Sequence, residues 1–236
     1  MNFMKSIGII AGLLFLIVSC RDAGNNTPER IVHEWNFEND TQGWEGSFAD
    51  YPVGEEEFYE LEFSFELLPA PLDNTSGALK LSGSNRSDDL FMYAKRKVTG
   101  LHPGTVYNIL FVVEFASNVP DNQVGIGGSP GESVYVKAGA TTHEPDRVID
   151  DMNYYRMNTD KGNQSQGGAE MIVIGDFSND TTLDVYVLKT LTNSEQGFSA
   201  LANETGELWI YVGTDSGFEG ATSIYFNHIR VELLSN

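Results

Sequence analysis

The sequence predicts an all-β protein, an antiparallel β-sandwich with a long irregular insertion. Three observations lead to this prediction: apolar and polar residues alternate in many short segments, the chain has 24 glycines, and aromatic residues make up 11% of it. Alternation with a period of two is typical of strands that have one buried and one solvated face. A length of 236 residues suits one sandwich domain, which can run to about 200–250 residues.

The first long strand shows the clearest alternation. Between Tyr59 and Leu67 every second residue is apolar, and Glu60, Glu62 and Glu66 lie among the residues between them. Residues 107–115 form the longest apolar series, with apolar residues on both faces, which predicts a central strand. Further strands are expected at residues 79–81, 90–94, 134–136, 171–174, 183–187, 208–212 and 229–233. Nine or so strands with turn residues between them favour a sandwich or jelly roll.

Two stretches do not follow the alternating pattern. Residues 118–133 are rich in Gly, Asn, Pro and Ser, and residues 139–169 are long and polar. Within the second stretch we expect a helical turn from Asp146 to Tyr155, after Pro145. Loops of this length are uncommon in a compact domain unless they are functional or disordered.

The N-terminal segment has the features of an export signal. Lys5 supplies a positive charge, and an uncharged apolar run follows from Ile7 to Val18. This run is shorter than the roughly 20 residues that a membrane-spanning helix needs, but it has the length of a signal-peptide core. Residues 1–19 are therefore expected to be a signal peptide.

The end of this segment, Ile17-Val18-Ser19-Cys20, resembles the lipobox of bacterial lipoproteins. The resemblance implies that Cys20, the only cysteine in the chain, becomes the first mature residue and carries acyl chains such as palmitate. It further implies an exported protein held in the cell envelope, at the outer membrane or cell surface. Residues 20–30 would then be a lipidated tether and residues 31–236 the sandwich domain. An ordinary signal peptide with a chance cysteine is the alternative.

The charge of the chain narrows the classes of partner. The formal net charge is −20 at pH 7, and no basic stripe is visible, which excludes nucleic acid. The acidic chain would also repel anionic lipid head groups. We therefore expect it to attach to its partner membrane through the lipid on Cys20 and not through a basic patch. The acidity serves solubility or, alternatively, cation binding by carboxylates.

Four motifs in order resemble carbohydrate-binding modules of the galactose-binding-like jelly-roll type. They are Trp35-Asn36-Phe37-Glu38 followed by Gly43-Trp44, residues 77–81, residues 98–107 with a Leu-x-Pro-Gly turn, and residues 223–231. The resemblance covers residues 35–117 and 205–234. It implies a non-catalytic module that binds a ligand, with carbohydrate as the indicated class; an envelope protein is the other expected partner.

The same resemblance implies a structural calcium ion. In these modules an acidic residue near the first strand and an Asp on the last strand bind the ion. Glu38 or Asp40 matches the first position, whereas Asn227 stands where the Asp would be. One negative charge is missing, and calcium affinity follows ligand charge, so the calcium site stays an open expectation.

A sugar-binding site needs exposed aromatic rings with polar groups beside them. Aromatic residues in loop-like, polar contexts are the candidates for ligand contact: Trp44, Tyr51, Tyr154, Tyr155 and Phe218. For each ring, packing inside the fold is the competing explanation.

No motif supports catalysis. Gly127-Gly128-Ser129-Pro130-Gly131 fits G-x-S-x-G, but Pro130 has no N–H for an oxyanion hole and no strand–turn–helix context is visible. The calcium-loop beginning Asp176-x-Ser178-x-Asp180 lacks the later Gly and Glu of an EF-hand. We therefore expect no enzyme. The rival hypotheses are a structural or protein-interaction lipoprotein without a small ligand and, further off, a hydrolase with its site in residues 118–170.

Overall fold

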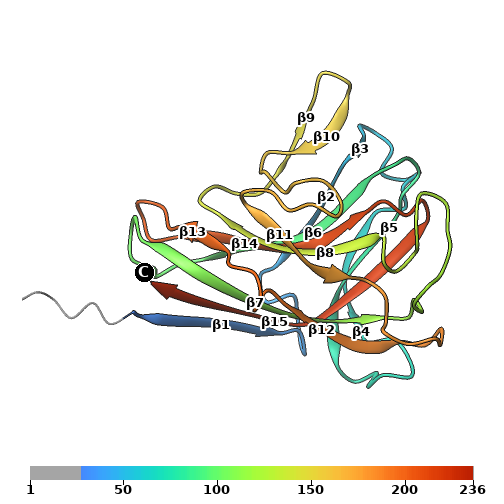
Figure 1. The fold of residues 1–236 in the computed structure, drawn as a ribbon, viewed down its shortest axis with the longest axis horizontal. Helices are drawn as coiled ribbons and strands as arrows, with labels where there is room; N and C mark the ends of the chain where they lie inside the picture. Colours follow the sequence, from blue (N-terminus) through green and yellow to red (C-terminus); the bar gives the residue numbers. More distant parts are fainter. Residues whose placement is uncertain (1–27, 236) are drawn as a thin grey trace, which may run out of the picture.

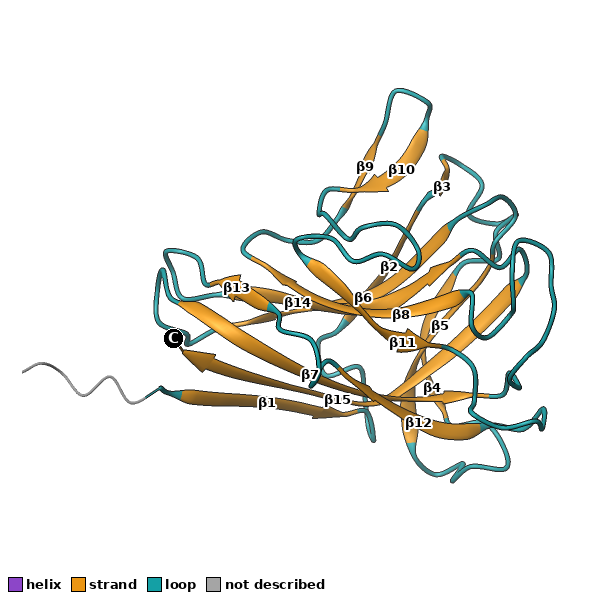
Figure 2. Cartoon of the chain, in the orientation of Figure 1, coloured by secondary structure: helices purple, strands orange, loops and turns teal. Residues whose placement is uncertain are grey.

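A computed structural model describes residues 28–235, which form a two-layer β-sandwich (Figure 1). All strand pairings are antiparallel, and the described residues contain no helix (Figure 2). The predicted antiparallel β-sandwich is confirmed. Residues 28–235 accordingly include no helix that is long and apolar enough to span a membrane, and Cys20 lies outside the described residues.

The first layer is a seven-stranded sheet. Its main order is β12 (Val187–Thr192), β7 (Val106–Ser117), β15 (Ala221–Ser235), β5 (Gly77–Ser84) and β4 (Glu62–Leu67), while β1 (Arg30–Asn36) pairs with β15 and β13 (Ser199–Leu201) pairs with β7. The longest apolar series of the sequence becomes β7, which lies between β15 and β12 as a central strand.

The second layer is a five-stranded sheet. Its order is β11 (Met171–Asp176), β8 (Val134–Thr141), β14 (Leu208–Ser216), β6 (Leu90–Val98) and β2 (Glu45–Ala49). Because successive side chains of a strand point to opposite faces, β8 and β14 place one set of residues in the core and the other set on the outer face. That outer face carries the candidate site.

Both sheets bury their apolar residues against each other in one core. Phe111 and Val113 of β7 and Ile210 and Val212 of β14 are completely buried there. Trp44 joins this core, and its ring meets Trp35 edge-on with 5.2 Å between ring centroids. Trp44, a candidate for ligand contact, instead packs inside the fold, which was the competing explanation, because only 1% of the residue is exposed.

The irregular insertion contributes two strands to a small sheet over the outer face of the second layer. These strands are β9 (Arg147–Ile149) and β10 (Tyr154–Met157), and β10 also pairs with β3 (Tyr51–Pro52), which comes from outside the insertion; Figure 1 shows this sheet standing above the five-stranded sheet. The expected helical turn from Asp146 to Tyr155 is therefore wrong. Met157 packs on the apolar outer-face residues Phe91, Tyr93 and Tyr211, so the insertion seals part of that face.

Candidate functional site

Two charged side chains are completely buried on the outer face of the five-stranded sheet. Side chains alternate between the two faces of a strand, and Val136, next to Lys137 in β8, points into the core. Lys137 of β8 therefore points to the outer face, and so does Asp215 of β14. Lys137 Nζ lies 2.7 Å from Asp215 Oδ2, and neither side chain has exposed surface. Burying an ion pair is costly unless further hydrogen bonds satisfy both partners.

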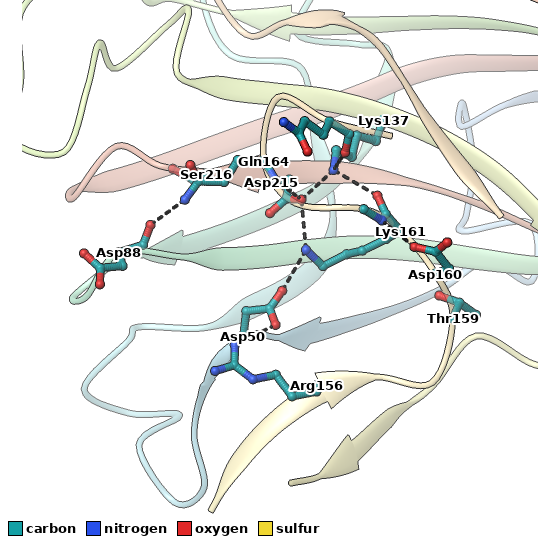
Figure 3. Close-up of polar contacts among 12 residues, drawn as sticks. Asp50, Asp88, Lys137, Arg156, Thr159, Asp160, Lys161, Gln164, Asp215 and Ser216 are labelled. Atoms are coloured by element: carbon teal, nitrogen blue, oxygen red, sulfur yellow. Dashed lines mark hydrogen bonds and ion pairs between the residues drawn. The ribbon is translucent and has the colours of Figure 1, made fainter. Parts of the chain in front are cut away.

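The inserted segment supplies those further bonds. Lys161 Nζ lies 2.9 Å from both Asp215 Oδ2 and Asp50 Oδ2 (Figure 3). Lys137 Nζ also donates to the backbone carbonyls of Lys161 and Gln166, each at 3.0 Å. Charge-assisted hydrogen bonds thus hold the loop after β10 against the sheet. With Asp89 added, we call these charged residues the ion cluster: Asp50, Asp89, Lys137, Lys161 and Asp215.

A cavity of about 250 Å³ opens beside the ion cluster. The β9–β10 hairpin lines one side with Met152, Tyr154 and Arg156, and the β5–β6 loop lines the other with Ser87, Asp88 and Asp89. Asp50, between β2 and β3, completes the lining. Gln164 Nε2 donates to the Asp88 carbonyl at 2.9 Å, so the inserted loop fixes the β5–β6 loop as well (Figure 3).

Arg156 organises the hairpin side of the cavity. Its guanidinium lies 3.0 Å from Asp50 Oδ1 and 3.1 Å from Asp150 Oδ2, and it is positioned over the ring of Tyr154, 4.9 Å from the ring centroid. A planar donor between two carboxylates is held in one orientation. The cavity wall therefore combines a fixed positive group with an aromatic ring.

The electrostatics of the ion cluster leave Asp89 in an unusual state. Burial raises the pKa of Asp89 to about 8, and the carboxylates of Asp215 and Asp50 act in the same direction. Burial would also raise the pKa of Asp215, but Lys161 and Lys137 outweigh it and hold that pKa below its ordinary value. At neutral pH Asp89 therefore keeps a proton beside an ionised Asp215.

The two lysines respond differently to the same surroundings. Burial lowers the pKa of Lys137, and Asp215 opposes that shift. Burial would lower the pKa of Lys161 too, but Asp215 and Asp50 outweigh it and hold this pKa above its ordinary value. Lys161 is thus the firmly charged cation of the cluster.

The acidic members of the cluster could offer ligands to a metal ion. One carboxylate oxygen from each of Asp50, Asp89 and Asp215 lies within 4.8 Å of the others. Calcium needs six to eight oxygen ligands, and the Lys161 ammonium is already 2.9 Å from oxygens of Asp50 and Asp215. The residues present fit an ammonium at this position better than a divalent cation.

The calcium residues expected from the family resemblance lie elsewhere. Glu38 and Asp40 are exposed in the β1–β2 connection, and Asp40 Oδ1 accepts a hydrogen bond from the Gln42 backbone N–H. Asn227 Nδ2 donates to Glu114 Oε1 at 2.7 Å. Among residues 28–235, Glu38 and Asp40 belong to no group of three acidic, His or Cys ligands. These residues do not assemble a calcium site.

A lysine also occupies the loop whose sequence begins like an EF-hand. Lys189 Nζ lies 3.0 Å from Asp176 Oδ1, 2.9 Å from Asp180 Oδ1 and 2.9 Å from the Ser178 carbonyl. Its ammonium supplies the positive charge that these oxygens need. Ser129 of the G-x-S-x-G segment is structural too, since its Oγ accepts from the N–H groups of Gly131 and Glu132.

The structure brings together some of the predicted aromatic residues. Tyr154 lines the cavity. Tyr155 is half-buried under Arg147 and packs against Tyr51 with 5.1 Å between ring centroids. Tyr51 has no exposed surface, so packing inside the fold accounts for this candidate ring, as it does for Trp44. Phe218 is half-buried beside the glycine-rich loop at Gly125 and does not line the cavity.

Sequence reasoning missed the charged residues of the site. One signal was present: Lys137 interrupts the apolar run Val134-Tyr135-Val136-Lys137-Ala138, and a buried lysine requires a buried partner. The partners Asp215 and Asp50 lie far away in the chain, and the sequence alone does not pair them.

No protein-family model matches the chain, and no curated protein matches its sequence. The enzymatically active domain of tailspike protein 4 from bacteriophage CBA120 is 12% identical, with a TM-score of 0.33 over 83% of this chain and 20% of that chain.

Two further similar structures are carbohydrate-binding modules. One, described among modules of promiscuous specificity from the β-sandwich superfamily, is 13% identical, with a TM-score of 0.37 over 81% of this chain and 58% of that chain. The other, described for specific mannan recognition, is 12% identical, with a TM-score of 0.36 over 86% and 98% of the two chains. This chain thus spans less than two thirds of the tailspike domain and of the first module. Similarity at this level bears on neither ligand nor activity.

Proposed function

We propose that this chain is a non-catalytic lipoprotein of the bacterial cell envelope that binds a carbohydrate in the cavity beside the ion cluster. The lining of the cavity carries the proposal, because it combines the Tyr154 ring and the Met152 side chain with polar groups of Asp88 and Arg156. Sugars present C–H faces that pack on aromatic rings and hydroxyl groups that bond to charged side chains. The volume of about 250 Å³ suits a ligand of one sugar unit, since larger ligands occupy pockets of roughly 300–1,000 Å³.

One carboxylate beside the cavity is occupied by cations. A glycosidase needs two carboxyl groups that are free to act on the substrate. Asp50 lies 3.0 Å from Arg156 and 2.9 Å from Lys161, so it is held by two cations. Turnover of a glycoside or ester by the purified protein would favour the rival hydrolase hypothesis.

Calorimetric titration with a panel of monosaccharides tests the proposal. We expect a saturable signal for at least one sugar, and Tyr154→Ala should weaken it by roughly two- to tenfold through loss of ring packing. Trp209→Ala is the matched control, because Trp209 is a half-exposed ring on β14 that does not line the cavity. A panel without any binding, or equal losses in both variants, would contradict the proposal.

Anchoring through Cys20 is part of the same proposal. The lipobox-like residues support it, and the acidic domain offers no electrostatic alternative, since a net charge of −20 is repelled by anionic lipids. A lipid-held module at the outer membrane or cell surface would present its cavity to glycans outside the membrane.

One observation favours a second function, that of a protein-interaction module. The β9–β10 hairpin exposes Val148, Ile149 and Met152, with 48, 59 and 71% of their surfaces accessible. Exposed apolar residues gathered on one hairpin are typical of contact surfaces. Chemical crosslinking in cells that recovers one envelope protein with the wild type, but not with Ile149→Lys, would support this function.

A further inference from the structure

Arg96 is the one lysine or arginine of residues 28–235 that has no carboxylate beside it. Twelve lysines and arginines lie in this part of the chain, and eleven of them have a carboxylate oxygen within 4.0 Å. The Arg96 guanidinium has none, and it donates no hydrogen bond to any residue in the same part of the chain. The chain has 34 acidic residues, so a shortage of partners does not explain the unpaired arginine.

The fold places Arg96 where the alternation of β6 calls for an apolar side chain. The residues two positions before and after it, Ala94 and Val98, belong to the core. Strand β2 begins at Glu45, opposite the residue before Arg96, so β2 does not cover the guanidinium. A Cβ atom added to Gly43 would lie 2.6 Å from Arg96 Nη1. The guanidinium therefore lies half-buried at the edge of the sandwich, in the space that this glycine leaves.

The ring of Trp35 joins Arg96 to two further nitrogen groups. The guanidinium lies over this ring, 5.6 Å from its centroid, and the His33 ring stacks on it with 5.8 Å between centroids and 8° between planes. Trp44, which follows Gly43, meets the same ring edge-on at 5.2 Å. His33 Nε2 and Trp44 Nε1 are buried, and neither has a hydrogen-bond partner among the described residues.

We call these four side chains the arginine cluster: His33, Trp35, Trp44 and Arg96. Leaving a buried nitrogen group without a partner costs free energy, and native proteins leave few of them. Three such groups around one ring, one of them charged, indicate that an acceptor from outside this part of the chain completes the cluster.

The charges of the arginine cluster indicate an anion of single charge. Burial lowers the pKa of His33, and the positive charge of Arg96 lowers it further, so His33 is neutral above pH 7. Burial lowers the pKa of Arg96 too, and Asp40 opposes that shift, but an arginine stays protonated. Asp40 is exposed, is not within 4.0 Å of the guanidinium, and accepts a hydrogen bond from the Gln42 N–H. One cation facing one exposed carboxylate favours a monoanion over a dianion.

We infer that the arginine cluster binds the carboxylate group of a small monoanionic ligand. A guanidinium presents paired N–H donors that match the two oxygens of a carboxylate, and His33 and Trp44 offer the further nitrogen groups. The site is separate from the cavity beside the ion cluster, because Asp89 precedes β6 and Arg96 lies near its other end, roughly 20 Å along the strand. Carboxylate binding here therefore does not depend on the proposed carbohydrate function.

Titration with sodium acetate, a hexuronic acid and inorganic phosphate at pH 7.5 tests this inference. Nuclear magnetic resonance spectra of the 15N-labelled protein report on the site directly. We expect acetate and the hexuronic acid to shift the Arg96 Nε–H and Trp44 Nε1–H signals to saturation, and phosphate to bind more weakly than acetate. The comparison of the two carboxylates identifies the source of the group. Equal affinities indicate any small carboxylate, and a hexuronic acid that binds more than about tenfold more tightly indicates an acidic sugar.

Arg96→Gln removes the charge and keeps a polar side chain. Acetate should bind at least about tenfold more weakly to this variant, because a charged hydrogen bond is lost. Arg96→Lys keeps the charge without the paired donors, so its affinity should lie between those of Arg96→Gln and the wild type. Arg230→Gln is the matched control, since Arg230 is already paired with Glu232, and it should bind acetate as the wild type does. Thermal midpoints check that each variant is folded.

Asp40→Asn makes the opposite change. It removes the one carboxylate that acts on Arg96, so acetate should bind roughly two- to fivefold more tightly, as for loss of an exposed competing charge. Because Asp40 is exposed, this variant tests the site even if Arg96→Gln does not fold. Unchanged or weaker acetate binding in Asp40→Asn overturns the inference. So does a titration without saturable shifts, phosphate that binds more tightly than acetate, or equal losses in Arg96→Gln and Arg230→Gln.

Discussion

Asp89 links the charge balance of the site to the stability of the fold. Its pKa in the folded protein is about 8, because burial and the carboxylates of Asp215 and Asp50 disfavour ionisation. The ordinary value is 3.8, so between these pH values the folded protein holds a proton that the unfolded chain has lost. The stability that Asp89 contributes is therefore full below pH 3.8 and is lost as the pH rises to about 8.

Asp89→Asn should remove this pH dependence. Relative to the wild type, the free energy of unfolding of the variant should increase steadily from pH 5 to pH 8.5, because the amide never ionises. Denaturant unfolding at pH 5, 7 and 8.5 measures the difference. The pKa of Asp73 is lowered, so this residue changes the pH dependence of stability in the opposite direction and only at acid pH. The stability of Asp73→Asn should therefore vary with pH as that of the wild type does over this range. Parallel curves for Asp89→Asn would contradict the assignment.

Lys137 of the ion cluster should tolerate substitution poorly. Lys137→Met retains the side-chain length but leaves Asp215 with one cation fewer at a position without exposed surface. Removing one partner of a buried pair costs about 3–5 kcal/mol. Chemical denaturation should show this loss, and Lys137→Met combined with Asp215→Asn should recover a large part of it. A loss below about 1 kcal/mol for the single variant would show that water reaches the pair.

At the residue scale, the sequence could indicate the buried lysine but not the site around it. A lysine within an apolar strand signals a buried partner, whereas the partners come from residues 50, 89, 161 and 215, and strand pairing and the inserted loop bring these together. The predicted ring of Tyr154 does line the cavity. For Trp44 the sequence left ligand contact and packing open, because its polar, turn-like neighbours give no sign of its contact with Trp35.

At the scale of elements, the edges of the two sheets meet tightly at Gly46. This glycine lies in β2, and a Cβ atom added to it would lie 2.2 Å from Phe63 Cγ of β4. Alanine in a strand would by itself gain about 0.5–1 kcal/mol in chain entropy over glycine. The overlap with the ring outweighs this gain, since overpacking typically costs about 1–3 kcal/mol.

Gly46→Ala should therefore lower the thermal midpoint, measured by circular dichroism. Gly197→Ala is the matched control, because an added Cβ there meets nothing within 4 Å, and it should leave the midpoint unchanged or slightly higher. Gly46→Ala combined with Phe63→Leu should restore part of the loss. Equal midpoints for Gly46→Ala and Gly197→Ala would show that the two sheets separate easily at this edge.

Strands with long alternation were predictable, and those defined by distant partners were not. The segments that became β6, β7, β14 and β15 show the alternation in their own residues. The strand expected at residues 183–187 begins only at Val187, because Asn179 Nδ2 binds the carbonyls of Leu183 and Val185 and holds that segment as a loop. The β9–β10 hairpin was missed because its turn depends on Asn153, which has a φ of 63°, and on pairing with β3.

At the scale of the whole molecule, the alternation of apolar and polar residues produces the sandwich, and one insertion covers one of its outer faces. Alternation predicts two solvated outer faces, but the apolar outer residues Phe91, Tyr93 and Tyr211 require a cover. Residues 143–170 supply that cover, and the ion cluster fixes it in place. The insertion that resisted prediction is therefore the segment that creates the cavity.

Membrane attachment, if it rests on the lipid alone, should be separable from the fold. Cys20→Ala removes the only thiol, so it should abolish labelling by a palmitate analogue and move the protein from the membrane to the soluble fraction of the cell. No other attraction should retain it, since the domain is strongly acidic and anionic lipids repel it. The thermal midpoint should be unchanged, because the sandwich core begins after residue 28. Ser19→Ala, which keeps a small residue before the thiol, is the control that should stay labelled; a Cys20→Ala protein that remains membrane-bound would refute the lipid anchor.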